Sequence, residues 1–263
     1  MPIIQSLLFH IPTFLLGFLI IVFYVASTII GLIIIRKIYP YDRCKNHNDI
    51  AGFIFATLGV IYAVILAFTV VVTWQEFDKA DDITGREANC IASLNQDTMA
   101  FPAEFRARIK GELRDYVNAI INDEWQTMER GQRSSKVHNI QDRIVQLYSG
   151  FQPENETQKI FLAESVKKLN EASELRRQRI VYASTGIHPI LYFVLFAGSF
   201  ITIGFTMLFG TENFAEHLIM TSALAAMIAF TLFTVISLDY PFTGKFSIEP
   251  DVFIKILPTL LGG

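Results

Sequence analysis

The chain offers few residues whose types and spacing could support catalysis or metal binding. Its five histidines lie far apart, and none has a second ligand at the spacing of a helical metal site. The motifs GxxxxGKS/T, GxGxxG, HExxH and GxSxG, which mark nucleotide-binding proteins and hydrolases, do not occur. We therefore predict no cofactor, no metal site and no enzymatic activity. Each histidine is expected at an interface or on the surface: His10, His47, His138, His188 and His217.

Acidic residues beside aromatic or basic residues are the next candidates for chemistry. Glu124 precedes Trp125, which could mean a general acid held against an indole; a solvated carboxylate beside a core aromatic explains the pair more simply. Glu87 follows Arg86 and is interpreted as a surface charge or as half of an ion pair between helices. Asp239 could cap the following turn, brace a neighbouring subunit or contact an ion. We predict structural or inter-subunit roles for Glu87, Glu124, Trp125, Arg179 and Asp239.

Composition places the chain among integral membrane proteins. Of its 263 residues, 52% are hydrophobic and 18% are charged, and the mean hydropathy of +0.39 is too high for an ordinary soluble domain. The net charge of -3 shows no basic excess, which argues against a nucleic-acid partner. The two cysteines, Cys44 and Cys90, form no CxxC pair and cannot make a metal site alone.

The elements that must position any site are apolar helices, and residues 50–74 form the most informative one. This run carries no charge and is long enough to cross a bilayer as a helix. At about 100° per residue, its side chains fall into two stripes. A stripe of small residues, suited to close helix packing, contains Gly52, Ala56, Gly59, Ala63 and Ala67. A bulky stripe, which lines either a pore constriction or the lipid, contains Ile54, Leu58, Ile61, Ile65 and Phe68.

Three further uncharged runs predict three more spans, over residues 13–35, 187–211 and 218–238. The first is interpreted as a retained anchor because its apolar core is too long for a signal peptide. A connector over residues 36–49 follows it, with aromatics expected at the membrane interface and with Arg36, Lys37, Arg43 and Lys45. Residues 239–263 are interpreted as a short tail.

Residues 75–186 differ from the rest because they contain most of the charge of the chain. Apolar residues at three-to-four spacing predict helices over 103–130, 137–147 and 157–182, after a helix that continues the second span to about residue 99. The predicted fold is an all-α polytopic membrane protein with four transmembrane helices and a helical bundle inserted between the second and third. Its segments are a first helix pair (1–74), an extramembrane insert (75–186) and a second pair with the tail (187–263).

The four predicted spans contain no ionisable residue except His188, near one end. Proton-coupled transporters and intramembrane hydrolases usually need buried acids, histidines or lysines at membrane depth, so both classes are disfavoured. A passive pore with a hydrophobic constriction needs no such group.

Several motifs spread over the chain resemble those of the bestrophin-like membrane family. They are GVIYAVILAF and VVVTW within residues 59–74, Glu87-Ala88, Tyr116 with Glu124-Trp125, Arg176-Arg177-Gln178-Arg179, and Asp239-x-Pro-Phe-x-Gly. The resemblance to the bestrophin anion channels themselves is weaker, and the sequence lacks an acidic run like the calcium clasp of the animal channels. The resemblance implies an oligomeric channel in the inner or plasma membrane, with a cytoplasmic insert and both termini inside.

The charges around the spans give opposing signals for orientation. Basic residues after the first span favour a cytoplasmic connector, whereas those before the third span favour a cytoplasmic insert: Lys167, Lys168, Arg176, Arg177 and Arg179. We follow the resemblance and expect the insert in the cytoplasm.

Two functional hypotheses remain. The first is a homo-oligomeric ion channel, for inorganic anions, whose second span lines the pore. The alternative is a membrane-anchored scaffold or sensor whose helical insert binds a partner. Four spans enclose little space, so only the channel hypothesis requires an oligomer. The expected partners are the lipid bilayer, further copies of the chain and, for a channel, anions.

Overall fold

The computed structural model describes residues 3–38 and 48–261, and every regular element within those ranges is helical. Four helical stretches are long and apolar enough to cross a membrane: Thr13–Ile38, Asn48–Ala100, Glu156–Thr206 and Phe214–Leu238. The predictions of an all-α protein and of four apolar helices are confirmed. The connector residues with predicted roles lie outside the described ranges: Tyr39, Pro40, Tyr41, Arg43, Cys44, Lys45 and His47.

The chain divides into two compact units, which we describe separately. The apolar unit comprises His10–Gln75 and Gly186–Asp239. The polar unit comprises Met1–Phe9, Glu76–Thr185 and Tyr240–Gly263. One long helix, α4 (Asn48–Asp97), contributes its first half to the apolar unit and its second half to the polar unit.

The apolar unit contains α2 (Thr13–Ile38), the first half of α4, α9 (Pro189–Thr206) and α10 (Phe214–Leu238). Helix α9 begins where the His188 ring accepts a hydrogen bond from the Ile190 amide (3.3 Å), with a proline in the first turn. Helix α10 begins earlier than predicted because Asn213 caps it, accepting from the Ala215 amide at 3.0 Å. The capping side chains therefore indicate where these helices begin more accurately than the first residues of the apolar runs do.

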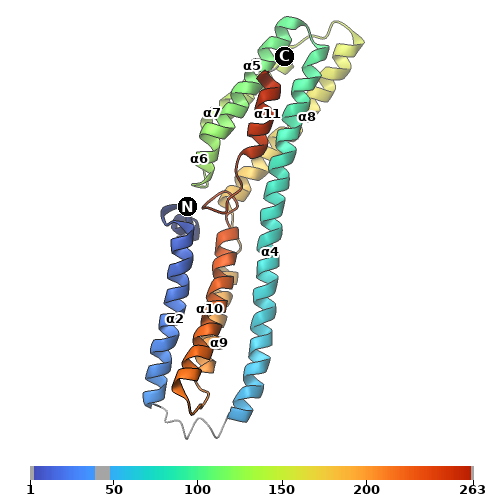
Figure 1. Cartoon of the computed structure of the whole chain (residues 1–263). Helices are drawn as coiled ribbons and strands as arrows, with labels where there is room; N and C mark the ends of the chain where they lie inside the picture. Colours follow the sequence, from blue (N-terminus) through green and yellow to red (C-terminus); the bar gives the residue numbers. More distant parts are fainter. Residues whose placement is uncertain (1–2, 39–47, 262–263) are drawn as a thin grey trace. The chain divides into compact units, whose positions relative to one another are not determined.

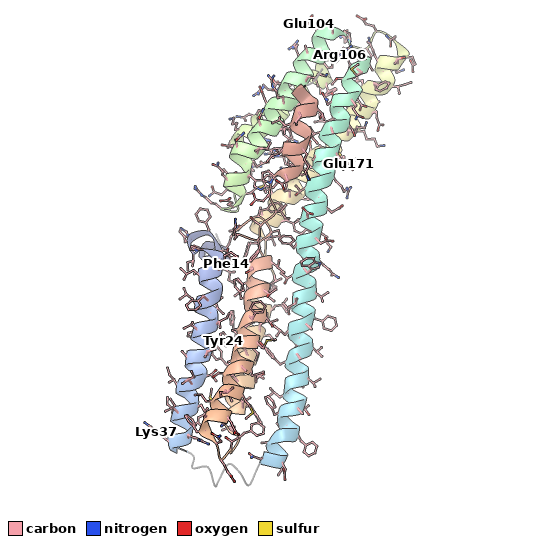
Figure 2. All side chains as sticks on the ribbon, viewed as in Figure 1. Phe14, Tyr24, Lys37, Glu104, Arg106 and Glu171 are labelled. Carbon is pink, nitrogen blue, oxygen red and sulfur yellow. The ribbon has the colours of Figure 1, made fainter. Side chains whose placement is uncertain are left out.

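Helices α2, α9 and α10 lie side by side in this unit (Figure 1). Tyr24 of α2, labelled in Figure 2, is buried, and its hydroxyl lies 2.7 Å from Ser199 Oγ of α9. Gly17 of α2 faces Phe233 of α10 so closely that a Cβ on it would lie 2.9 Å from the ring. Small residues and paired hydroxyls thus hold these helices together, as expected where lipid removes the hydrophobic drive between helices.

The first half of α4 contacts α9 through two aromatic residues, Phe55, whose ring stacks on Phe205 with centroids 6.0 Å apart, and Tyr62. The Tyr62 hydroxyl donates to the Leu195 carbonyl at 3.1 Å, and its ring covers Gly198. A Cβ built on Gly198 would lie 2.5 Å from Tyr62 Cδ2, a distance that real Cβ atoms do not reach. Gly198 is therefore the residue that permits α4 and α9 to approach at this level.

The polar unit is built from further helices and helical turns around the second half of α4. They are α1 (Ile3–His10), the 3-10 turn η1 (Thr98–Ala100), α5 (Ala103–Ala119), the π-helical turn η2 (Ile120–Glu124), α6 (Trp125–Met128), α7 (Ser135–Gly150), α8 (Glu156–Ser184) and α11 (Asp251–Leu261). The predicted helix over 103–130 is present but contains the π-turn, so its register shifts after Ala119.

Local signals explain where these helices start. Pro102 precedes α5, the Ser134 hydroxyl accepts from the Val137 amide at 3.1 Å, and Asn155 accepts from the Gln158 amide at 2.9 Å. Each helix then buries one apolar stripe in a shared core, to which α4, α5, α7, α8 and α11 all contribute.

The segment interpreted as a tail forms part of this core. Phe242 and Phe253 are buried, and the Trp125 indole donates to the Ile248 carbonyl at 3.0 Å. Helix α11 was not predicted, since it is short and contains Pro258, a residue that usually ends a helix, although its apolar residues keep helical spacing. The polar unit therefore draws on both chain ends as well as on residues 76–185.

We predict that Gly198→Ala destabilises the protein whereas Gly204→Ala does not. The added methyl at Gly198 must push the Tyr62 ring aside, an overpacking cost of about 1–3 kcal/mol. Gly204 lies on the same helix, and a Cβ added there would meet no atom of the described residues within 4 Å, so alanine should be neutral or slightly stabilising. Thermal unfolding in detergent measures both. Equal midpoints for the two variants would show that the Tyr62–Gly198 contact does not hold α4 on α9.

Candidate functional site

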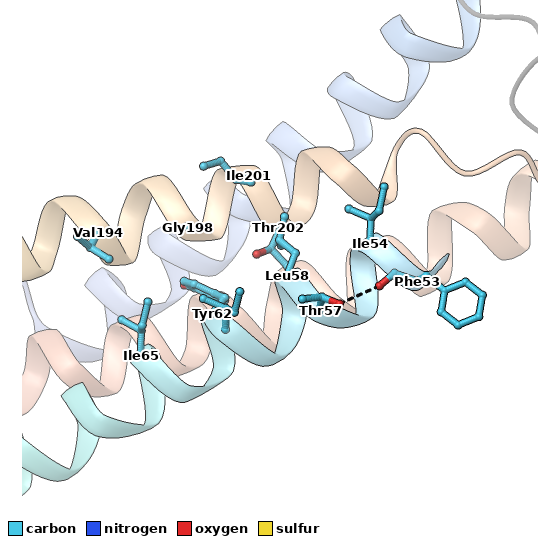
Figure 3. A pocket seen from close by; sticks show the side chains of 11 residues that line it. Phe53, Ile54, Thr57, Leu58, Tyr62, Ile65, Val194, Gly198, Ile201 and Thr202 are labelled. Carbon is cyan, nitrogen blue, oxygen red and sulfur yellow. Dashed lines mark hydrogen bonds between the residues drawn. The ribbon is translucent and has the colours of Figure 1, made fainter. Parts of the chain in front are cut away.

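Four residues of the bulky stripe line one cavity in the apolar unit, of about 600 Å³. The cavity lies between α4 and α9, and Figure 3 shows its lining from close by. Ile54, Leu58, Ile61 and Ile65 are part of the lining, together with Phe53, Thr57, Tyr62, Val194, Gly198, Ile201 and Thr202. Phe68, the fifth residue of the stripe, is not in the lining and is 69% exposed.

The lining is apolar apart from three hydroxyl groups, and two of these are already bonded. Thr57 donates to the Phe53 carbonyl at 3.2 Å (dashed in Figure 3), and Tyr62 donates to the Leu195 carbonyl. The third, on Thr202, is buried and has no hydrogen-bond partner within the described ranges. This hydroxyl can therefore bond water or a solute that enters an otherwise apolar groove.

The glycines of the small-residue stripe have open space around them among the described residues. A Cβ added to Gly52 or Gly59 would meet no atom within 4 Å among the residues described, and the alanines of the stripe are at least partly exposed: Ala56, Ala63 and Ala67. Its role in helix packing stays a prediction, and any packing partner must come from outside the described chain.

The face of α4 that packs inside the apolar unit was missed by sequence reasoning. It contains Tyr62, Thr69 and Thr73, all buried, and lies between the two predicted stripes. Both threonine hydroxyls donate to carbonyls of their own helix, Thr69 to Ile65 (2.9 Å) and Thr73 to Thr69 (2.8 Å). The sequence signal that could have identified this face was the recurrence of hydroxyl-bearing residues at helical spacing in a span with few hydrogen-bonding side chains.

In the polar unit, four predicted or motif residues meet in one buried charge network. Arg179 of α8 donates to Glu87 of α4 through Nε (2.7 Å) and Nη2 (3.1 Å), and Nη2 also reaches Glu124 at 3.0 Å. Arg176, one turn earlier, donates to Glu124 through Nε (3.1 Å to each oxygen) and Nη2 (2.5 Å). Two guanidinium groups thus neutralise two carboxylates.

The network is almost sealed from solvent, which corrects two interpretations. Glu87 and Glu124 are both 0% exposed. Glu124 is therefore not a solvated surface carboxylate, and Glu87 pairs with Arg179 rather than standing as a surface charge beside Arg86. The interpretation of Glu124 was wrong because it relied on the general preference of carboxylates for water, whereas Arg176 and Arg179 compensate its charge inside the core. The interpretation of Glu87 as half of an inter-helix ion pair is confirmed.

The pKa values of Glu87 and Glu124 shift in opposite directions because the two carboxylates have different partners. Burial alone would raise the pKa of Glu124, but Arg179 and Arg176 together hold that pKa below its ordinary value. For Glu87, burial raises the pKa despite the opposing effect of Arg179. The stabilisation from Glu124 is therefore present above the ordinary carboxylate pKa and is lost as the pH falls through the lowered value.

Aromatic groups complete the surroundings of Arg179. Its guanidinium lies over the Trp125 ring at 5.1 Å and over the Phe253 ring at 5.5 Å. The remaining nitrogen, Nη1, contacts Met128 Sδ at 2.8 Å. The structure thus brings together Glu87, Glu124, Trp125 and Arg179, and α11 contributes Phe253. Every nitrogen of the Arg179 guanidinium is engaged, so the cluster is built to hold helices rather than to bind a ligand.

Asp239 lies apart from this network, at the end of α10 in the apolar unit. Its Oδ1 accepts from the Ile187 amide and its Oδ2 from the Tyr192 hydroxyl, both at 2.7 Å. Burial raises the pKa of Asp239, and these two hydrogen bonds oppose the rise. Asp239 therefore ties the end of α10 to the start of α9.

The histidines form no metal centre in the described part of the chain, where no group of three His, Cys, Asp or Glu side chains could hold an ion. His10, His138 and His188 are at least partly exposed. His217 is buried, contrary to the prediction, because it lies one turn inside α10 and faces the end of α9.

Comparisons with known proteins place these features in a family. The bestrophin-like domain family matches residues 22–253. No curated protein sequence matches the chain. Among solved structures, a variant of a bacterial bestrophin homologue from Klebsiella pneumoniae aligns with a TM-score of 0.72 at 14% identity, covering 92% of this chain and 97% of that one.

Two further structures of the Klebsiella pneumoniae homologue agree. A second variant has a TM-score of 0.66 at 16% identity, over 93% of this chain and 99% of that one. The structure phased with zinc has a TM-score of 0.66 at 16% identity, over 92% and 97%. At such identities the likeness shows the fold alone.

We predict that Arg179→Met strongly destabilises the protein, whereas Arg177→Met leaves it almost unchanged. Removing Arg179 leaves the buried charge of Glu87 without a guanidinium, a loss of about 3–5 kcal/mol, while Glu124 keeps Arg176. Arg177 is a matched control, since it lies in the same helix and pairs with Glu174 at the exposed surface. Chemical denaturation in detergent reports both. If the two variants unfold at the same denaturant concentration, the buried network does not stabilise the polar unit.

Proposed function

This chain belongs to the bestrophin-like family, and from that membership we propose that it is a homo-oligomeric anion channel of the cell membrane. The observation that carries the proposal is the bulky stripe of α4. Four of its residues face a cavity that the side chains of the described chain leave unfilled, and Ile61 is 58% exposed. In the proposed assembly, copies of α4 surround a common axis and this stripe forms the constriction.

The channel hypothesis requires an oligomer because four spans enclose little space by themselves. The small-residue stripe of α4 is free of close contacts at its glycines among the described residues and suits close approach of a helix from a neighbouring copy. The bulky stripe occupies a different side of the same helix. One side of α4 would therefore pack against a second subunit while another narrows the pore.

The proposed gate is physical rather than chemical. A narrow ring of isoleucine and leucine side chains cannot hydrogen-bond water, so the constriction empties of water. Ions, which need their hydration water, then cannot pass. Widening the ring, or adding a hydroxyl, lets water remain and restores conduction. The unpaired Thr202 hydroxyl, which lines the same cavity, is the one polar group within the described residues available to retain water there.

The preference for anions follows from the family and not from a basic surface. The buried network of the polar unit is neutral, with two arginines and two glutamates. We further propose that the insert, residues 75–186, lies in the cytoplasm as a vestibule, and that the chain has no enzymatic activity.

The alternative is a membrane-anchored scaffold or sensor whose helical insert binds a partner. A specific observation favours it: the surface of the polar unit carries a polar hollow of about 440 Å³ between α5 and α7. Its lining includes Lys136, Arg143 and three asparagines, Asn118, Asn122 and Asn139. This hypothesis needs neither an oligomer nor a pore.

We predict that Ile61→Ala and Ile65→Ala raise basal anion flux, because smaller side chains widen the constriction. Ile61→Ser should raise it further, since its hydroxyl keeps water in the gap. Chloride and nitrate flux into liposomes containing the purified protein measures the effect.

Val64→Ala is the matched control for these variants. Val64 lies on the same helix, is half exposed and is absent from the cavity lining, so its truncation should leave flux unchanged. If wild type and all three widened variants are silent toward chloride, nitrate, sodium and potassium after confirmed insertion, the pore assignment is wrong and the scaffold becomes the better hypothesis.

We also predict that Gly59→Leu and Ala63→Leu disrupt assembly, because bulk on the small stripe prevents close helix approach. Each single chain should still fold, because a Cβ added at Gly59 meets no atom of the described residues within 4 Å. Light scattering of the detergent-solubilised protein gives the particle mass, with Val64→Leu as the control. Unaltered particle mass in both small-stripe variants would mean that this stripe faces lipid.

A further inference from the structure

A second cavity in the apolar unit lies at the opposite end of α9 from the Asp239 tie. It has a volume of about 320 Å³ and is formed by the start of α4, the end of α9 and the first turns of α10. Its lining residues are Asn48, Phe55, Thr206, Phe209, Thr211, His217, Met220, Thr221 and Leu224. This volume is at the lower end of the range of small-molecule pockets.

Nearly every polar group of this lining already has a partner within the chain. The Asn48 side chain is bonded twice to Gly210, donating at 2.7 Å and accepting at 2.9 Å. The three threonine hydroxyls donate to backbone carbonyls: Thr206 to Ile203, Thr211 to Asn213 and Thr221 to His217. None of them needs a ligand.

His217 is the exception. It is 3% exposed, and its Nε2 lies 3.0 Å from the Thr206 carbonyl. A carbonyl oxygen can only accept, so Nε2 carries a proton, and in the tautomer protonated at Nε2 alone the Nδ1 atom keeps a lone pair. Nδ1 is buried and has no hydrogen-bond partner within the described ranges. A buried acceptor left unpaired is unfavourable, and a ligand that donates one hydrogen bond would remove that penalty.

We propose that this cavity binds an uncharged lipid with a hydroxyl head group, such as a long-chain alcohol, whose O–H donates to His217 Nδ1. Phe55, Phe209, Met220 and Leu224 then surround its apolar chain. The lining contains no Asp, Glu, Lys or Arg among the described residues, so an ammonium or carboxylate head would be buried without a counter-charge. The hydroxyl matches the single unused acceptor.

The test compares ligands that share a chain and differ only at the head. Full-length protein in nanodiscs is photolabelled with a diazirine-bearing decanol, and labelled residues are mapped by mass spectrometry. We expect labelling around Phe209 and Met220. Unlabelled decanol should compete about tenfold better than decane, which cannot donate to Nδ1, and also better than decanoate or decylamine.

A spectroscopic readout reports the hydrogen bond itself. In protein labelled with ¹⁵N-histidine, decanol should shift the Nδ1 resonance of His217, assigned with His217→Gln, and leave the exposed histidines unchanged. A resonance that decanol does not move would mean an internal water or an empty cavity only, and would overturn the proposal.

Two variants on α10 separate binding from misfolding. Leu224→Trp fills the cavity without replacing His217 and should abolish labelling, while Met227→Trp, at an exposed position outside the lining, should preserve it. Labelling that survives Leu224→Trp, or decane that competes as well as decanol, would exclude this site. None of these measurements depends on ion flux, so the result is independent of the proposed channel activity.

Discussion

The polar unit depends on one interaction, the pairing of Arg179 with Glu87 and Glu124 at zero exposure. Bringing these charges out of water is costly, and the cost is offset only when each lone pair and each N–H is used. The structure offsets this cost by giving Arg179 carboxylate partners from α4 and the π-turn and by placing Phe253 of α11 against its guanidinium. Glu124 is the last residue of the π-turn and lies in the core, where Arg176 and Arg179 both reach it. A buried network of this kind specifies which helices meet and in which register.

The apolar unit follows a different rule because lipid competes for its apolar surfaces. Besides a cluster of buried apolar side chains, its contacts include close approaches at glycines, such as Gly17 against Phe233 and Gly198 against Tyr62, and hydrogen bonds from the Tyr24 and Tyr62 hydroxyls. Large apolar side chains are left pointing outward, among them Phe53, Ile61 and Phe68 on α4. This distribution is what a membrane protein needs if it must both face lipid and offer surfaces to further copies of itself.

The two proposals use different consequences of that packing. The channel hypothesis rests on α4, whose bulky stripe faces a cavity that the described residues leave open. The lipid site rests on His217, where a single acceptor remains after every other polar group of a second cavity is paired. In both cases an unused hydrogen-bonding group in an apolar wall, Thr202 or His217, marks where a solute could enter.

The sequence by itself determined the class of the protein and the positions of its four apolar helices. Uncharged runs such as 50–74 are decisive because a charge at membrane depth is costly wherever it occurs, so the constraint is local to the run. Family membership was likewise visible in motifs spread along the chain. Only the tertiary structure decided that Glu87 meets Arg179 rather than Arg86, that α11 fills the core of the polar unit, and that α4 packs through Tyr62, Thr69 and Thr73. These contacts join residues far apart in the chain, and no periodicity records which helix lies opposite a given face.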